Sequence, residues 1–587
     1  MLRFIFSVVL PAAMLAALLP AAAQEIRPDY AIATDPVLEA PPPVPPDTRR
    51  LTDLWLVALA RPESQMQRQT AEAIVRAHAD GIGGLEKSCP ALVKIVAAEK
   101  SHPAARYAAA QALVALDHKA GAAALRAAAE QHGSLVRQVV EPALARWNDQ
   151  PIRAVWLARL KDPHAQRRDL LLALAGLGTV REESAAPLCL ALAADVHRSA
   201  DVRLAAARAA GSIADRGWEE QAEKWAGAAS APLIDRLCAA ALLIRHQSAQ
   251  AQEILARLAK DAEPAVASAA LAHLHTIDVE LVLPLAEDAM RSADANVRKE
   301  GAAAYVLRPT PERVQTLAAL LDDPHPALRG QVRDDLFRLA KAAELDESVR
   351  AAATEMLAGE SWRGQEQAAL LLAALDHKPA APRLVELLES KRPEVMVATA
   401  WGLRKLAIPE TLPAIFDKAR RQTEGRKRGG DVPGLDAQVA HLCEALGLMK
   451  YAPADPVLRE YIPKRQDWML SRMAGIWALG HLHAGEPDEE LALLLIARLT
   501  DSDPMNPETQ AARVSSALSL GRMLAVSQEP AMRAWMGPEI NPEPVDMSIR
   551  WALIEMTGEE LPPPLAPAGR LRTWFLEPLA APGEAGR

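Results

Sequence analysis

Aromatic rings other than indole are scarce in this sequence, with five Phe and five Tyr among 587 residues, although half of the residues are hydrophobic. The apolar content is therefore mainly Ala and Leu, which are strong helix formers. Val and Ile are too sparse, and alternate with polar residues too rarely, for a protein rich in β-sheet. This composition predicts an all-α protein, and the chain is too long for one compact core.

Cysteine is also rare. The four cysteines lie far apart and form no C-x-x-C or C-x-x-C-H motif, so the usual zinc, redox and c-type haem signatures are missing. Each lies in an apolar pattern with helical spacing: Cys89, Cys189, Cys238 and Cys443. We interpret them as small buried hydrophobic side chains. A disulfide in an oxidising compartment is the alternative, and the sequence does not select a pairing.

Recognisable catalytic motifs are missing as well: there is no P-loop, no G-x-S-x-G, no H-E-x-x-H and no dinucleotide-binding glycine pattern. His273/His275 and His481/His483 are spaced i and i+2, which on a helix turns the side chains about 200° apart and prevents chelation of one metal ion. We therefore predict no catalytic, cofactor or metal site, and a protein that is not an enzyme. The net charge of −9 argues against a nucleic-acid partner, because phosphate binding needs a concentrated basic surface.

The amino terminus has the organisation of a secretory signal peptide. Residues 1–23 contain Arg3, an apolar run over residues 4–19, and small residues up to Ala23. We expect cleavage after Ala23 and a periplasmic or extracellular location, with an uncleaved anchor as the alternative. No later segment is long and apolar enough to span a bilayer. Residues 24–50 form a Pro-rich spacer, which we interpret as a semi-rigid tether.

One pattern recurs along the rest of the chain. A Val-Arg pair followed by small residues occurs at 199–211 and again at 295–304. The register positions of about 15 such units are Arg68, Arg106, Arg137, Arg168, Arg203, Arg236, Ala267, Arg298, Arg329, Arg363, Ala398, Ala440, Arg472, Arg513 and Arg550. The mean spacing is roughly 34 residues, which is typical of repeat architectures. We interpret the recurring Arg as structural, with its head on an acceptor such as Asp201.

Each unit also carries a second amphipathic stretch, such as residues 251–259, so that one unit is two helices joined by a turn. The pattern at 199–211 resembles a HEAT repeat, specifically the short HEAT-like class also seen in phycobilin lyases. The resemblance implies an all-α, right-handed α-α superhelix (HEAT/ARM-like solenoid) of about 15 helix pairs over residues 51–557. Residues 558–587 would be a Pro-rich tail in which Trp574-Phe575-Leu576 caps the last repeat.

Six basic residues gather where the repeat spacing is interrupted, within residues 418–430 and beside a single acid. They are Lys418, Arg420, Arg421, Arg426, Lys427 and Arg428. A solvated, flexible loop is the ordinary interpretation of such a run. The functional alternative is a loop that docks an anionic polymer, a lipid headgroup or an acidic partner.

The spacing breaks again at residues 501–508 and 528–544. Alternating acids there suggest a calcium loop, but the ligand order of an EF-hand is missing, and we predict a Pro-rich surface loop. Tryptophan is comparatively frequent, and Trp401, Trp468, Trp477 and Trp551 cluster in the carboxy-terminal third. We expect these indoles to fill the core between Ala-rich helices. Indoles on the concave face would instead be partner-binding anchors, with Trp401, Trp468 and Trp477 as the candidates.

The fold, the signal peptide and the missing motifs together favour a non-catalytic protein–protein interaction scaffold of the cell envelope or extracellular space. One alternative is a role in chromophore or cofactor attachment, which the lyase-type resemblance implies. Another is an envelope module that binds anionic surfaces through residues 418–428. The sequence identifies neither the protein partner nor the oligomeric state.

Overall fold

The computed structural model describes residues 26–42, 51–227, 231–430, 432–465, 467–536 and 540–566. The predicted signal peptide and the proposed cap at residues 574–576 lie outside the described residues. Thirty α-helices and no strand occur in the described part of the chain, which confirms the all-α prediction.

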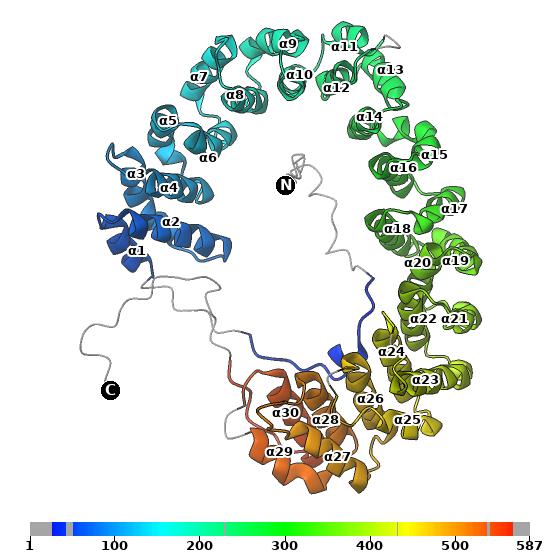
Figure 1. The fold of residues 1–587 in the computed structure, drawn as a ribbon. Helices are drawn as coiled ribbons and strands as arrows, with labels where there is room; N and C mark the ends of the chain where they lie inside the picture. Colours follow the sequence, from blue (N-terminus) through cyan, green and yellow to red (C-terminus); the bar gives the residue numbers. More distant parts are fainter. Residues whose placement is uncertain are drawn as a thin grey trace. The chain divides into compact units, whose positions relative to one another are not determined.

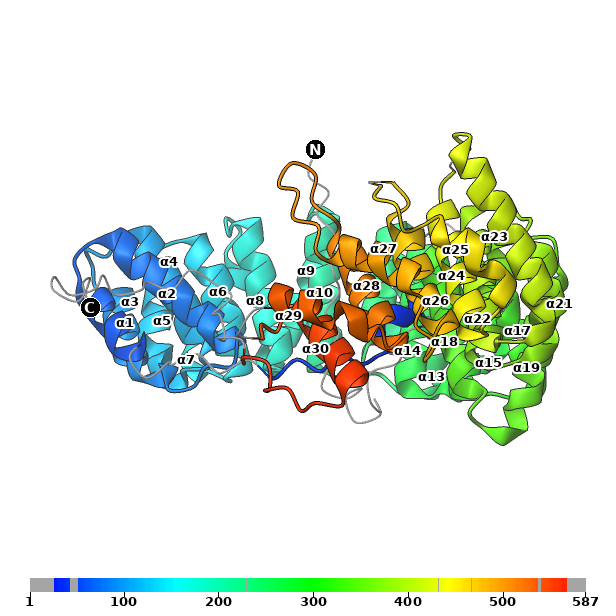
Figure 2. The same ribbon diagram turned by 90° about the horizontal axis from the view of Figure 1, so that it is seen from below.

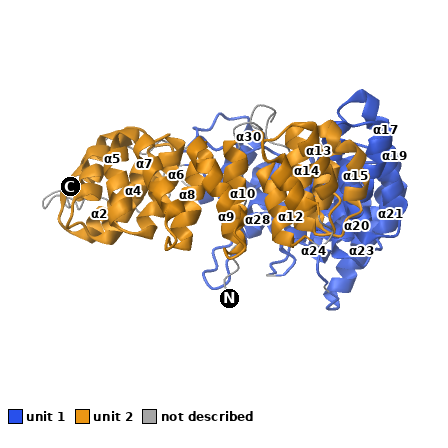
Figure 3. Ribbon diagram, turned by 90° about the horizontal axis from the view of Figure 1, so that it is seen from above, with its two compact units in different colours: residues 1–42, 305–567 blue, residues 43–304, 568–587 orange. Residues whose placement is uncertain are grey.

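The helices form two compact units, and the boundary between them falls within α16 (Figure 3). Unit 2 contains residues 51–304 of the described chain. Its helices are α1 (Leu51–Ala60), α2 (Ser64–Ala79), α3 (Cys89–Ala97), α4 (Pro103–Ala115), α5 (Ala122–Gln131), α6 (Ser134–Arg146), α7 (Gln150–Lys161), α8 (Arg167–Thr179), α9 (Ala186–Ala194), α10 (Ala200–Ile213), α11 (Glu219–Ala226), α12 (Leu233–Leu242), α13 (Ala249–Leu258), α14 (Pro264–Ile277), α15 (Leu283–Met290) and most of α16 (Ala295–Leu307).

Unit 1 contains residues 26–42 and 305–566 of the described chain. Its helices are α17 (Pro311–Ala318), α18 (Pro326–Leu339), α19 (Ala343–Ala358), α20 (Trp362–Ala374), α21 (Ala381–Leu387), α22 (Pro393–Leu406), α23 (Leu412–Lys427), α24 (Leu435–Leu448), α25 (Asp455–Arg459), α26 (Met469–Leu482), α27 (Glu489–Leu499), α28 (Gln510–Arg522), α29 (Glu529–Met536) and α30 (Pro544–Thr557). One 3-10 turn, η1 (Ala31–Ala33), lies in its amino-terminal segment.

Consecutive helix pairs build both units. From α1 to α14 and from α17 to α30, each even-numbered helix packs on the odd-numbered helix before it, and neighbouring even-numbered helices pack side by side (Figure 1). Each unit therefore has one layer of even-numbered and one layer of odd-numbered helices. A single pair leaves an apolar face open, and stacking covers it with the next pair.

The recurring register of the sequence is confirmed, since each of the fifteen register positions lies in the first half of a different even-numbered helix. The guanidinium of Arg203 shows why Arg recurs there. Its Nε donates to the carbonyl of Ala193 at the end of α9 (2.8 Å), and its Nη2 contacts Asp235 of α12 (2.5 Å). Such an Arg satisfies a carbonyl left open at a helix end and ties two pairs together. The expected acceptor Asp201 pairs instead with Arg167.

All four cysteines are buried and carry free thiols. Burial raises the pKa of Cys189 and Cys238 to about 12, which keeps both thiols protonated at neutral pH. Among the residues that the structure describes, no helix has the length and apolarity needed to span a membrane.

Candidate partner-binding site

Residues 26–36, here called the docked segment, lie against the even-numbered helices of unit 1 (Figure 1). Ile26 and Ala31 are buried there, and the backbone amide of Ile26 points at Asp334 of α18 (3.4 Å). The interpretation of residues 24–50 as a tether did not anticipate this packing. The reason is that the contacts come from side chains more than 300 positions away in the chain.

Asp29 of the docked segment contacts α22 through both its side chain and its backbone. Its Oδ1 accepts hydrogen bonds from Trp401 Nε1 (2.7 Å) and Arg404 Nη2 (2.6 Å), both on α22. Arg404 Nη2 also donates to the carbonyl of Asp29 (2.8 Å). One indole N–H and one guanidinium thus bind both the carboxylate and the backbone of this residue.

The next contacts are made on α24. The Tyr30 ring stacks on the His441 ring, with a centroid distance of 4.8 Å and an interplanar angle of 15°. The amide of Ala31 donates to Glu444 Oε1 (2.6 Å), while Glu444 Oε2 lies 3.2 Å from Arg404. Burial and the charge of Glu444 raise the pKa of Tyr30 to about 12, so the stacked ring stays neutral.

Asp35 makes the last set of contacts. Its Oδ2 lies 2.9 Å from His481 Nε2 on α26, and its Oδ1 lies 3.0 Å from Arg522 Nη2 on α28. The carbonyl of Asp35 accepts from Trp477 Nε1 (2.8 Å) and from Arg522 Nη2 (2.7 Å). The combination of an indole N–H and a guanidinium, first used at Asp29, is repeated here.

These side chains form one continuous set on four neighbouring helices, which we call the docking row. Its members are Trp401, Arg404, His441, Glu444, Trp477, His481 and Arg522. Most of its contacts to the segment are hydrogen bonds to carboxylates and to backbone groups. Chemically, the row can bind a short polypeptide segment that carries acidic side chains.

Trp401 and Trp477 of this row were candidates from the sequence, whereas the other five residues were missed. A weak signal was present, because three consecutive even-numbered helices each carry two row residues spaced i, i+3 or i, i+4, which places both on one helix face. These pairs are Trp401 with Arg404, His441 with Glu444, and Trp477 with His481. The third candidate, Trp468, is buried between the guanidiniums of Arg426 and Arg465 instead.

The interpretation of residues 418–427 as a loop is wrong, because these residues form the end of helix α23, which projects in Figure 2. The error has a physical cause: Lys418, Thr423 and Arg426 point inward and give the helix a buried polar face, which resembles a loop in sequence. Each basic residue has an acidic neighbour: Lys418 has Glu389, Arg420 has Asp417, Arg421 has Glu389, Arg426 has Asp436, Lys427 has Glu460, and Arg428 has Glu424. Anion binding by this helix stays a prediction, and local pairing weakens the case for it.

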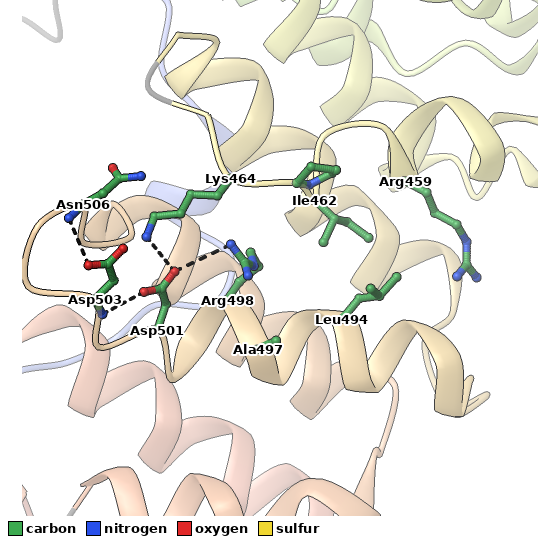
Figure 4. Close-up of a pocket in the computed structure, with 10 residues that line it drawn as sticks. Arg459, Ile462, Lys464, Leu494, Ala497, Arg498, Asp501, Asp503 and Asn506 are labelled. Carbon is green, nitrogen blue, oxygen red and sulfur yellow. Dashed lines mark hydrogen bonds and ion pairs between the residues drawn. The ribbon is translucent and has the colours of Figure 1, made fainter.

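A surface depression lies beside the acidic loop between α27 and α28. This loop projects from the helices in Figure 2. The volume of the depression is about 620 Å³, and it is lined by α25, the following residues 462–464, α27 and this loop (Figure 4). Asp501 is held there by Lys464 (2.7 Å) and by Arg498 (3.7 Å). Its carboxylate is therefore already neutralised by cations, and this geometry does not resemble a calcium loop.

The two histidine pairs contact different groups, as their spacing predicts. His481 contacts Asp35, whereas His483 Nε2 lies 2.7 Å from Asp455. His275 Nε2 lies 2.8 Å from the carbonyl of Glu300, and burial lowers the pKa of His273 to about 4. Within the described ranges, no three His, Cys, Asp or Glu side chains are grouped to hold a metal ion.

Comparison with known proteins identifies the fold and no more. No protein-family model and no curated protein sequence matches the chain. Among solved structures, importin beta is 13% identical, with 86% of this chain and 72% of that chain covered and a TM-score of 0.48. Kap95p with RanGDP is 12% identical, with coverages of 87% and 72% and a TM-score of 0.50. The karyopherin Kap121p bound to the extreme C-terminus of Cdc14p is 13% identical, with coverages of 87% and 57% and a TM-score of 0.46.

Of these matches, the one to Kap95p reaches a TM-score of 0.50 and supports a HEAT/ARM-like α-solenoid fold. Nothing in them supports the phycobilin-lyase type of the HEAT resemblance. The chain is thus an α-solenoid of stacked helix pairs, and what it binds has to be argued from its own docking row.

Proposed function

We propose that this chain is a non-catalytic protein-binding scaffold, and that the docking row of unit 1 binds a short segment of a partner protein. The observation that carries the proposal is the docked segment itself. The row already holds a stretch of polypeptide through the kinds of contact that an extended ligand offers: backbone amides and carbonyls, carboxylates and one aromatic ring. Solenoid surfaces commonly bind extended partners in this way.

We further propose that the protein acts outside the cytoplasm, in the periplasm or extracellular space. The support is the signal-peptide pattern of residues 1–23. Cleavage after Ala23 would leave the whole docked segment, which begins at Ile26, in the mature chain. Fractionation of cells that express the full chain, with amino-terminal sequencing of the product, tests the location. A cytoplasmic product that still carries residues 1–23 would disprove it.

Affinity purification tests the scaffold function. Mature protein from Gln24 onward, cross-linked in its native compartment, should retain a protein partner in stoichiometric amount. The double variant Arg404→Ala/Arg522→Ala should lose that partner. The matched control is Arg420→Ala/Arg421→Ala, which removes two arginines from the surface of α23 and should leave the partner bound. Equal retention by both variants would rule out the docking row as the binding surface.

The alternative of anionic-surface binding through α23 has its own test. Replacing the exposed residues Arg420, Arg421, Lys427 and Arg428 with Ser should leave sedimentation with phosphatidylglycerol vesicles unchanged. The reason is that each of these cations already faces an acid. Loss of vesicle binding in this variant would favour the alternative over the scaffold.

A further inference from the structure

One residue of the docking row, Arg522, is a buried cation whose carboxylate partner comes from the docked segment. Arg522 is 9% exposed in its side chain, and its guanidinium lies over the rings of Trp477 (5.1 Å) and Trp551 (5.6 Å). Within the described residues, Asp35 is the only carboxylate within ion-pair distance of it. A buried cation above two apolar rings requires an anion, and here the docked segment provides it.

The Asp29 end of the row differs in one respect. Arg404 is 4% exposed in its side chain and keeps Glu444 as a second carboxylate, so it would remain paired if the segment left. The indole N–H of Trp401, by contrast, donates to Asp29. The row therefore presents two indole N–H groups and two guanidiniums to its ligand, with the His441 ring between them.

The docked segment buries few of its own side chains. Ile26 and Ala31 are its buried apolar residues, and the carboxylates of Asp29 and Asp35 remain 45% exposed even when docked. Each ion pair buries its guanidinium but only about half of its Asp side chain, so both carboxylates keep contact with water while the segment is docked. Attachment to the same chain raises the local concentration of the segment above that of a free peptide, which favours docking through these contacts. A free ligand with the same contacts can then compete with it.

From these observations, and resting on the proposed scaffold function, we propose that the docked segment is an internal occupant of a site whose external ligand is an acidic peptide with a turn between its two Asp residues, as at η1. The ligand carries two Asp residues six positions apart and an aromatic residue directly after the first, as in Asp29-Tyr30 and Asp35. The partner displaces residues 26–36 when it binds. The docked segment thereby sets a threshold concentration that a partner must exceed.

A fluorescent peptide with the sequence of residues 26–36 tests this directly. It is titrated into the mature chain, into the same chain lacking residues 24–36, and into the mature chain carrying Asp29→Asn/Asp35→Asn. The peptide should bind the deletion chain at least tenfold more tightly than the mature chain. The Asn variant should also bind it more tightly than the mature chain, because its own segment is released while every residue of the row is retained.

Three altered peptides define the ligand. Asp29→Asn/Asp35→Asn, Tyr30→Ala, and an isomer in which residues 33 and 35 are exchanged should each bind the deletion chain several-fold to tenfold more weakly. The isomer keeps composition and charge and changes only the spacing of the two acids. Equal binding of the isomer would overturn the spacing requirement and leave only a general preference for acidic chains.

Other outcomes overturn the inference more broadly. No peptide binding to a deletion chain with a native circular dichroism spectrum would mean that the row is not a peptide site. Equal affinity of the mature and deletion chains would mean that the segment does not block it. A mature chain that is dimeric in light scattering, with a monomeric deletion chain, would place the segment in a second copy. None of these readouts needs the natural partner, so they fail or succeed independently of the affinity purification that tests the scaffold.

Discussion

At the scale of single residues, the carboxyl groups of Asp35 and Asp29 should make docking of the segment depend on pH. Hydrogen bonding to His481 and the charge of Arg522 lower the pKa of Asp35 against the opposing effect of burial. Burial alone would raise the pKa of Asp29, but the Trp401 hydrogen bond and the charges of Arg404 and Lys405 lower it. These are the charged and titratable groups that face the two carboxylates.

A carboxyl group whose pKa is lower when docked stabilises docking above the pKa of the free group, and this contribution is lost as pH falls through the docked value. We therefore expect the contribution of these two carboxylates to peptide affinity for the deletion chain to be similar at about pH 7 and at about pH 5. Below about pH 4 this contribution, and with it the affinity, should fall. Anisotropy titrations at each pH measure it, with circular dichroism to confirm that the chain is folded. The Asp29→Asn/Asp35→Asn peptide is the control, and an equally steep fall in its affinity would assign the pH effect to other groups.

Arg472 is the residue whose loss should cost unit 1 most. Its guanidinium binds Glu508 through two contacts of 2.9 Å and also donates to three carbonyls, and both side chains are 1% exposed. Removing one partner of a buried pair leaves an uncompensated charge, and we expect Arg472→Ala to cost about 3–5 kcal/mol. Urea unfolding followed by circular dichroism measures the loss.

The control for this substitution is Arg420→Ala on α23, which removes an exposed Arg from pairs with Asp417 and Glu424. An exposed pair of this kind contributes about 0–1 kcal/mol. Equal destabilisation by both substitutions would show that burial does not determine how much these ion pairs contribute to the free energy of unfolding.

At the scale of helices, the repeat was predictable and the docked segment was not. A period of roughly 34 residues is visible in the sequence because the even-numbered helices pack in the same way and carry similar residue types at equivalent positions. Docking, in contrast, joins residue 35 to Trp477 and Arg522, which lie 442 and 487 positions away, and no periodicity encodes that. The carboxy-terminal part of helix α23 was missed because polar and basic residues occupy positions where apolar residues would mark a helical period, although Arg and Lys are good helix formers.

Glycine at the contacts between even-numbered helices gives an element-scale prediction. A Cβ added at Gly447 of α24 would lie 2.6 Å from the Cα and Cβ of Ala478 on α26, so the two helices would have to separate. We expect Gly447→Ala to destabilise unit 1 by about 1–3 kcal/mol. Gly330 of α18 has no heavy atom within 4 Å of an added Cβ, and Gly330→Ala should stabilise by up to about 1 kcal/mol. Thermal unfolding of both variants should show shifts of opposite sign, and two shifts of the same sign would contradict the packing argument.

At the scale of the whole molecule, the strong packing contacts between described helices join each helix pair to the neighbouring pairs of its own unit. Stability in such an array is close to a sum of local terms and nearest-neighbour interfaces. Unfolding is then not required to be all-or-none, and a single free energy of unfolding describes a local region rather than the entire chain.

Hydrogen exchange of Gly447→Ala examines this locality. The substitution strains the packing of α24 on α26, and α22 to α28 include the helices that pack directly on these two, so exchange should rise in α22 to α28 and diminish with distance along the chain. Peptides from α2 to α10 in unit 2 should exchange as in the unmodified protein. A uniform rise across both units would mean that they unfold as one cooperative body. A rise confined to α22–α28 would mean that the docking row is also loosened, since its seven residues lie on those helices. The peptide of residues 26–36 should then bind the deletion chain of this variant more weakly, even though every contacting side chain is present.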